Sequence, residues 1–145
     1  MIDSGIALTQ DNEGYREGIY LDSLGYPTTG YGFCLDSSFV YSSVKEWHQR
    51  KFFEMYNQAE ANYEKYNFGL DPVRRAAVVD LLYNLGPNRF SKFVNFISAL
   101  RMKDWNSAVN SLEHSLWFKQ VGRRGPRITK LIKEGKWEAL WARTR

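Results

Sequence analysis

The 145-residue sequence has only one cysteine, Cys34, and two histidines, His48 and His114. A single thiol excludes a disulfide within the chain, which fits synthesis in a reducing cytoplasm. No histidine pattern accompanies Cys34 that would make it a nucleophile. The two histidines do not have the spacing of metal ligands, so we expect no metal and no other cofactor. Both lie in charged helical contexts, and the sequence predicts that both are surface residues.

Long apolar runs are also absent. No segment approaches the roughly 18 apolar residues that a membrane-spanning helix needs. The N-terminal stretch MIDSGIALTQDNEG has no basic region and no apolar core of the kind found in signal peptides. We therefore expect no signal peptide and no membrane insertion, so passage to a target beyond the membrane would need another agent.

Basic residues are scarce near the start of the chain and abundant at its end. Residues 1–40 contain six acidic residues and one base, Arg16, whereas residues 71–145 contain fifteen bases and six acids. Such an excess favours a polyanionic partner, which could be nucleic acid, anionic lipid or an acidic cell-wall polymer. The arginines are dispersed and no nucleic-acid recognition motif accompanies them, so a nucleic-acid-binding helical domain rests on charge alone.

The pattern of apolar residues predicts an α+β, mostly helical fold. The composition is 43% hydrophobic, which is enough for a sizeable core in one domain of residues 1–145. The β signal is confined to residues 18–34. We expect a small α+β lobe at about 13–50, a connecting helix at about 51–68, and a helical lobe at about 71–145 that includes a helix at 3–12. A ligand cleft would lie between the two lobes.

Helix boundaries are marked by capping residues. Ser4 can cap the first helix, whose apolar contacts would come from Ile6 and Leu8. Ser43 begins a capping box ahead of the long helix. Asp71 followed by proline starts another helix, PVRRAAVVDLLYNL, which ends at Gly86. Because that helix is apolar on several faces, we expect it to be the buried centre of a helical bundle.

Three polar residues lie among turn-forming residues in the stretch EGYREGIYLDSLGYPTTGYG, which spans residues 13–32. They are Glu13, Asp22 and Thr28. Glu13 can also be interpreted as a surface carboxylate, Asp22 as a turn residue and Thr28 as an ordinary strand residue. Two carboxylates facing a cleft are nevertheless the minimum for cleaving a glycosidic bond. One gives its proton to the leaving oxygen, and the other stays ionised and directs a water.

The order of these residues resembles the active-site signature of the phage-type lysozymes, the endolysins of T-even phages. The shared pattern is E-G-x-R-x-x-x-Y-x-D-x-x-G-x-x-T-x-G-x-G. The later segments DPVRRAAVVDLLYNLG and SLWFKQ also resemble the family's helical lobe in order. The resemblance implies a lysozyme-like two-lobe fold and a muramidase, which hydrolyses the β-1,4 bond between N-acetylmuramic acid and N-acetylglucosamine with inversion. It further implies a bacteriolytic, antimicrobial role in host cell lysis.

The resemblance also implies roles for individual residues. Glu13 matches the general acid, Asp22 the second carboxylate, and Thr28 the hydroxyl that helps to hold the attacking water. We expect partial desolvation in the cleft wall to raise the pKa of Glu13. The positions that match sugar contacts are Gly32, Cys34, Tyr83, Asn84, Phe96 and Ser111. Tyr83 and Phe96 can equally be core aromatics.

Two departures from the family pattern concern the front of the chain. Phe33 stands where members often have histidine, so any polar bridge of that histidine is replaced by aromatic packing. The segment between Thr28 and Asp71 is shorter than in the best-known members, which predicts a shallower outer cleft. These departures affect substrate affinity more than chemistry.

The expected partner is bacterial peptidoglycan, and the expected state is a monomer. The protein would remain in the host cytoplasm until a holin-type lesion releases it to the cell wall. One alternative is a lysozyme-like module that binds peptidoglycan without cutting it. The intact set of Glu13, Asp22 and Thr28 favours the enzyme, because a binding module has no need of all three.

Overall fold

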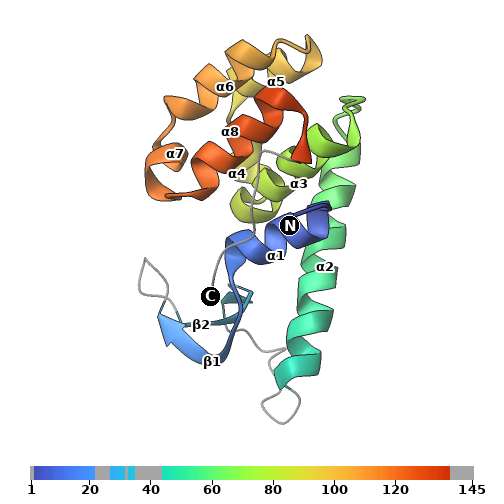
Figure 1. Ribbon diagram of the computed structural model, residues 1–145. Helices are drawn as coiled ribbons and strands as arrows, with labels where there is room; N and C mark the ends of the chain where they lie inside the picture. The colour runs from blue at the N-terminus through green and yellow to red at the C-terminus, as the bar shows by residue number, and fades with distance from the viewer. Residues whose placement is uncertain (1, 22–26, 32, 35–43, 138–145) are drawn as a thin grey trace.

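The computed structural model describes residues 2–21, 27–31, 33–34 and 44–137 (Figure 1). Three short strands are followed by a series of helices, which confirms the mostly helical α+β fold. The elements are α1 (Gly5–Glu13), β1 (Arg16–Leu21), β2 (Pro27–Gly30), β3 (Phe33–Cys34), α2 (Val44–Glu64), α3 (Pro72–Leu85), α4 (Pro87–Ser91), α5 (Val94–Arg101), α6 (Trp105–Glu113), α7 (Leu116–Gln120) and α8 (Arg124–Glu134).

The three strands form an antiparallel sheet in the order β1-β2-β3. Tyr20 of β1 pairs with Thr28 of β2, which pairs in turn with Cys34 of β3. In Figure 1 the sheet lies at one end of the molecule and α5–α8 lie at the other, with α1 between them. The long helix α2 runs along one side, from the level of the sheet to that of α3.

Helix α3 is the centre of the core, as its apolar sequence predicted. Every residue from Ala76 to Leu82 is buried, and α3 packs against α1, α2, α4 and α8. Asp71 caps it by accepting a hydrogen bond from the backbone N–H of Arg74. Gly86, with a φ of 80°, ends it. Placing a charged residue, Asp80, in this buried stretch demands polar partners from neighbouring helices.

The connecting helix differs from its predicted bounds. It begins at Val44, directly after Ser43, the first residue of the predicted capping box, and ahead of the residue 51 given for the connecting helix, and it ends at Glu64, before Asn67 and Gly69 with their positive φ angles of 52° and 66°. Ser43, the predicted cap, lies outside the described residues. The buried apolar residues of this helix recur mostly at three- and four-residue steps and are Trp47, Phe52, Tyr56, Ala59 and Tyr63.

Two predictions about exposure are wrong. His48 is fully buried rather than on the surface, because it lies one turn before Phe52 on the buried face of α2. Both ring nitrogens of His48 have a hydroxyl as hydrogen-bond partner. Tyr15 Oη lies 3.1 Å from Nδ1, and Thr29 Oγ1 lies 3.0 Å from Nε2. Ile6 is 38% exposed, so on α1 the core contact comes from Leu8. His114, by contrast, is exposed as predicted.

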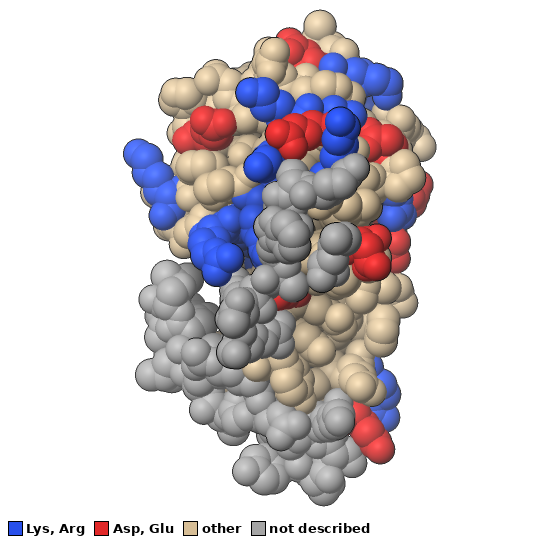
Figure 2. All heavy atoms as spheres, in the orientation of Figure 1, with Lys and Arg blue, Asp and Glu red and all other residues tan. Residues whose placement is uncertain are grey.

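Charge is distributed unevenly over the surface. In the view of Figure 2, most Lys and Arg side chains lie over the half of the molecule that α3–α8 form. Within the described residues, no helix combines the length and the apolar character of a membrane span.

Candidate active site

Glu13 is the last residue of α1, and its side chain is 15% exposed. Gly14 follows with a φ of 68°, a left-handed value that favours glycine, and β1 begins two residues later at Arg16. The side chain of Glu13 therefore lies where the chain leaves the helical half of the molecule and enters the sheet.

A buried arginine joins Glu13 to a second carboxylate. Arg124 of α8 donates from Nη1 to Glu13 Oε1 at 2.9 Å. It also donates to Asp80 of α3, from Nε to Oδ2 at 2.9 Å and from Nη2 to Oδ1 at 3.1 Å. Arg124 is 6% exposed and Asp80 is fully buried. The result is a carboxylate–guanidinium–carboxylate cluster from three helices that are distant in sequence.

Two further donors complete the surroundings of Asp80. Thr9 donates its hydroxyl to Oδ1 at 2.6 Å, and Asn12 donates its amide to Oδ2 at 3.1 Å. Burial acts to lower the pKa of Arg124, but the charges of Asp80 and Glu13 outweigh it and raise that pKa above its usual range. The guanidinium therefore stays cationic beside Glu13.

A second ion pair joins the same two helices. Arg127 of α8 donates from Nη1 to Asp11 Oδ2 at 2.7 Å and to Asn12 Oδ1 at 2.8 Å. Asn12 thus accepts from Arg127 and donates to Asp80. Because Arg124 and Arg127 of α8 both donate hydrogen bonds to α1, they hold the end of α1 that carries Glu13 against the helical half.

Tyr83 lies one turn after Asp80 on α3. Its ring packs beside Phe52, with centroids 5.7 Å apart. Its buried hydroxyl has no hydrogen-bond partner among the described residues. Burial, followed by the negative charge of Glu13, raises the pKa of Tyr83, so the phenol stays neutral. Tyr83 therefore lies near enough to Glu13 for the carboxylate charge to act on it, and its contact with substrate stays a prediction.

Thr28 lies on β2 and is 2% exposed. Side chains alternate between the two faces of a strand, and its neighbour Thr29 points to His48 of α2. Thr28 therefore points to the face of the sheet that is opposite to His48. Asp22 and Gly32 lie outside the described residues. Cys34 is described by its backbone alone, as the partner of Thr28 in β3.

The remaining predicted substrate contacts lie in the helical half. Asn84 is half-buried and accepts a hydrogen bond from Trp117 Nε1–H at 2.8 Å. Phe96 is fully buried and packs edge-on against Phe90 at 6.2 Å. The prediction that Phe96 contacts sugar stays a prediction, and the burial of its ring favours the alternative interpretation. In that interpretation it is a core aromatic, because the apolar face of α5 turns it inward.

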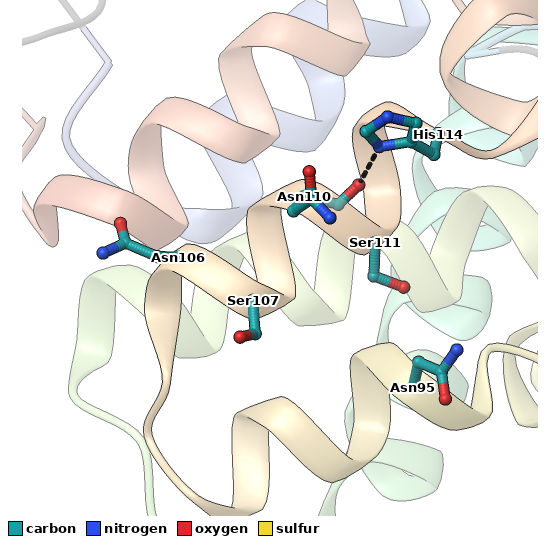
Figure 3. A pocket seen from close by; sticks show the side chains of 6 residues that line it. All are labelled: Asn95, Asn106, Ser107, Asn110, Ser111 and His114. Atoms are coloured by element: carbon teal, nitrogen blue, oxygen red, sulfur yellow. Dashed lines mark hydrogen bonds between the residues drawn. The ribbon is translucent and has the colours of Figure 1, made fainter.

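Ser111 lines an open pocket of about 580 Å³ between α5 and α6, which has an almost wholly uncharged polar lining (Figure 3). Its other lining residues are Asn95, Asn106, Ser107, Asn110 and His114. Ser107 and Ser111 of α6 point toward the gap, and Asn95 of α5 lies across it. In the part of the chain that the structure describes, no three His, Cys, Asp or Glu residues are grouped to hold a metal ion.

Sequence reasoning missed Asp80 and Arg124. Asp80 carried a signal, since it is the one charged residue within the stretch AAVVDLLYNL. Arg124 lies in GRRGPR, a segment that also resembles the family's helical lobe, but charge alone could not select it from the fifteen bases in residues 71–145.

Comparisons of the sequence with known proteins identify its family. The Phage lysozyme family matches residues 10–138. Probable T4-type lysozyme 1 of Dictyostelium discoideum is 26% identical over 66 residues, which is 46% of this chain and 39% of that protein. Probable T4-type lysozyme 2 of the same organism is 29% identical over 66 residues, with the same shares. The Pre-baseplate central spike protein Gp5 of Enterobacteria phage T4 is 29% identical over 66 residues, which is 46% of this chain and 12% of that protein.

The aligned part thus spans less than two-fifths of each of these relatives. The family match, by contrast, spans most of this chain and includes Glu13, Asp80 and Arg124. With its lysozyme-like, mostly helical fold, the chain belongs to the phage lysozyme family.

Proposed function

We propose that this protein is a peptidoglycan hydrolase, an N-acetylmuramidase that cleaves the β-1,4 bond between N-acetylmuramic acid and N-acetylglucosamine. The observation that carries the proposal is the placement of Glu13. Its carboxyl group is partly desolvated, 15% exposed, and oriented by Arg124 at 2.9 Å. A general acid needs this combination of fixed direction and limited contact with water.

In the proposed reaction, Glu13 gives its proton to the glycosidic oxygen as that oxygen leaves the anomeric carbon. Asp22 and Thr28 hold a water, whose oxygen attacks the same carbon from the opposite face and whose proton passes to Asp22. This path inverts the anomeric centre and needs about 6.5–9.5 Å between the two carboxyl groups. The direction of Thr28, away from His48 and α2, supports its role.

The proposal treats residues 1–145 as one domain that acts as a monomer. Substrate would lie between the sheet and the helical half, near Tyr83 and Asn84. The basic surface in Figure 2 supports an anionic polymer as the partner. The protein would reach the cell wall from the host cytoplasm through a holin-type lesion.

The test is the release of new reducing ends from purified peptidoglycan sacculi, with mass spectrometry of the products. Glu13→Gln should abolish release, because an amide is too weak an acid to protonate the leaving oxygen. Glu60→Gln is the matched control, since Glu60 pairs with Arg75 on another face at 3.1 Å. Equal release by wild type and Glu13→Gln would refute the assignment of the acid.

The alternative is a module that holds peptidoglycan without cutting it. The excess of fifteen bases over six acids in residues 71–145 favours this alternative, because positive charge can hold an anionic polymer without cleaving it. Cosedimentation with sacculi at low salt, together with no new reducing ends from the wild type, would identify such a module.

A further inference from the structure

We propose that Asp80 is a positioning residue that neutralises Arg124 and thereby lets Glu13 keep the proton it donates. This inference rests on the proposed role of Glu13 as the general acid. It concerns a residue that the active-site motif does not contain.

The need for such a residue follows from the contact between Arg124 and Glu13. A cation 2.9 Å from a carboxylate favours the ionised form. Without Asp80, Arg124 would favour the ionised form of Glu13, which lacks the proton that the reaction requires. Asp80 opposes that tendency, because two of the three hydrogen bonds that Arg124 donates to carboxylates go to Asp80.

The net charge of the cluster explains how Asp80 favours the protonated form of Glu13. When Glu13 is protonated, Asp80 and Arg124 balance each other. When Glu13 is ionised, two negative charges share one positive charge where Asp80 is 0% and Arg124 is 6% exposed. An uncompensated charge is costly in such a poorly solvated place, so the cluster favours the state in which Glu13 carries the proton.

The hydrogen bonds decide which of the two acids carries that proton. Asp80 accepts four of them, from Thr9, Asn12 and twice from Arg124, so each of its two oxygens already accepts two donors. Glu13 is the more exposed of the two, so it is the one that a substrate can reach.

Other ionisable groups surround the cluster in the described part of the chain. The charges of Glu13, Arg124 and Asp80 act on the hydroxyl of Tyr83 in α3. Tyr31, just after β2, also acts electrostatically on Tyr83. Asp11 and Arg127 form a pair of their own between α1 and α8. That pair supplies a control, because it too is a buried carboxylate on an α8 arginine.

The test compares Asp80→Asn with Asp11→Asn. The Glu13 carboxyl carbon is labelled with ¹³C and titrated by NMR, and hydrolysis is measured from pH 4 to 9. In Asp80→Asn, Arg124 acts on Glu13 without opposition. The Glu13 midpoint should therefore fall by about 1–2 pH units, and the alkaline limb of the rate profile should move with it. Asp11→Asn should move both less, because Asp11 pairs with Arg127 and not with Arg124.

A midpoint that stays or rises in Asp80→Asn overturns the proposal. If that variant does not fold, Asp80→Asn/Arg124→Gln, which removes both charges, provides the test. The cluster then holds neither the cation nor its counter-charge, so the Glu13 midpoint should lie at or above that of the wild type. A lower midpoint overturns the proposal. Because the titration needs no turnover, an inactive wild type would refute the muramidase while leaving the role of Asp80 open to confirmation.

Discussion

Replacing Arg124 with methionine removes the guanidinium that joins Glu13 to Asp80, while the new side chain fills much of the space of the arginine stem. Asp80 would then be fully buried with no cationic partner. It would keep only the hydrogen bonds from Thr9 and Asn12. Stability, rather than activity, is the sharpest readout of this change, because it reports directly on an uncompensated buried charge.

The magnitude follows from the burial of the pair. Removing one partner of a buried ion pair costs about 3–5 kcal/mol. The two remaining donors to Asp80 favour the lower end, about 3 kcal/mol. Unfolding entropy is about 2.1 cal/mol/K per residue, so a chain of 145 residues loses about 3 °C in Tm per kcal/mol. Arg124→Met should therefore lower Tm by about 10 °C at neutral pH.

Thermal unfolding followed by calorimetry measures this loss, with Arg75→Met as the matched control. Arg75 also pairs with two carboxylates, Glu60 and Glu64, but its side chain is 32% exposed. Its loss should cost about 1 kcal/mol or less. The double variant Arg124→Met/Asp80→Asn should recover at least half of the lost stability, because it removes the unpaired charge. Equal losses for Arg124→Met and Arg75→Met, or no recovery in the double variant, would refute the reasoning.

Three further outcomes are expected. Gly30→Ala should lower the free energy of unfolding by about 2–4 kcal/mol, measured in urea. The reason is that its φ is +64° and that a Cβ would lie 2.6 Å from His48 Cδ2. If Gly30→Ala costs as much in a His48→Ala background as in the wild type, the contact with His48 is not the cause. Hydrogen bonds from the Ser107 hydroxyl and N–H lower the pKa of Asp104, so its stabilisation is present above the ordinary value and lost as pH falls through the lower folded value. The Tm gap between wild type and Asp104→Ala should therefore close as pH falls from 7 to about 2, and a gap independent of pH would count against it. Hydrolysis should weaken as ionic strength rises past about 0.15 M, where the Debye length is near 8 Å; a flat salt profile would exclude long-range attraction.

Features that depend on neighbouring residues were predictable from the sequence. Ser4 and Asp71 cap helices where their side chains predicted it, and Gly86 ends α3. A cap is a contact across three residues, so its signal is contained in the local sequence. The central place of α3 followed from its apolar faces in the same way.

Features that depend on distant partners were not predictable. Glu13 and Arg124 are 111 residues apart in sequence, and spacing cannot select one arginine from a basic region. His48 was misjudged because charged neighbours outweighed its register with Phe52. Its hydroxyl partners come from Tyr15, just before β1, and from Thr29 of β2, which the helical pattern does not reveal. The sequence also predicted a partly desolvated Glu13, whose side chain is 15% exposed, but it did not reveal the buried cation beside that carboxyl group.

His48 links the two parts of the candidate site. One ring nitrogen contacts Tyr15, two residues after Glu13, and the other contacts Thr29, the residue after Thr28. The acid is fixed from the helical side through Arg124, while the threonine is carried by the sheet. One imidazole therefore joins the segment that follows the acid to the strand that carries the hydroxyl. A neutral imidazole has one donor and one acceptor, and each hydroxyl can act as either, so both hydrogen bonds can form without a charge on the ring.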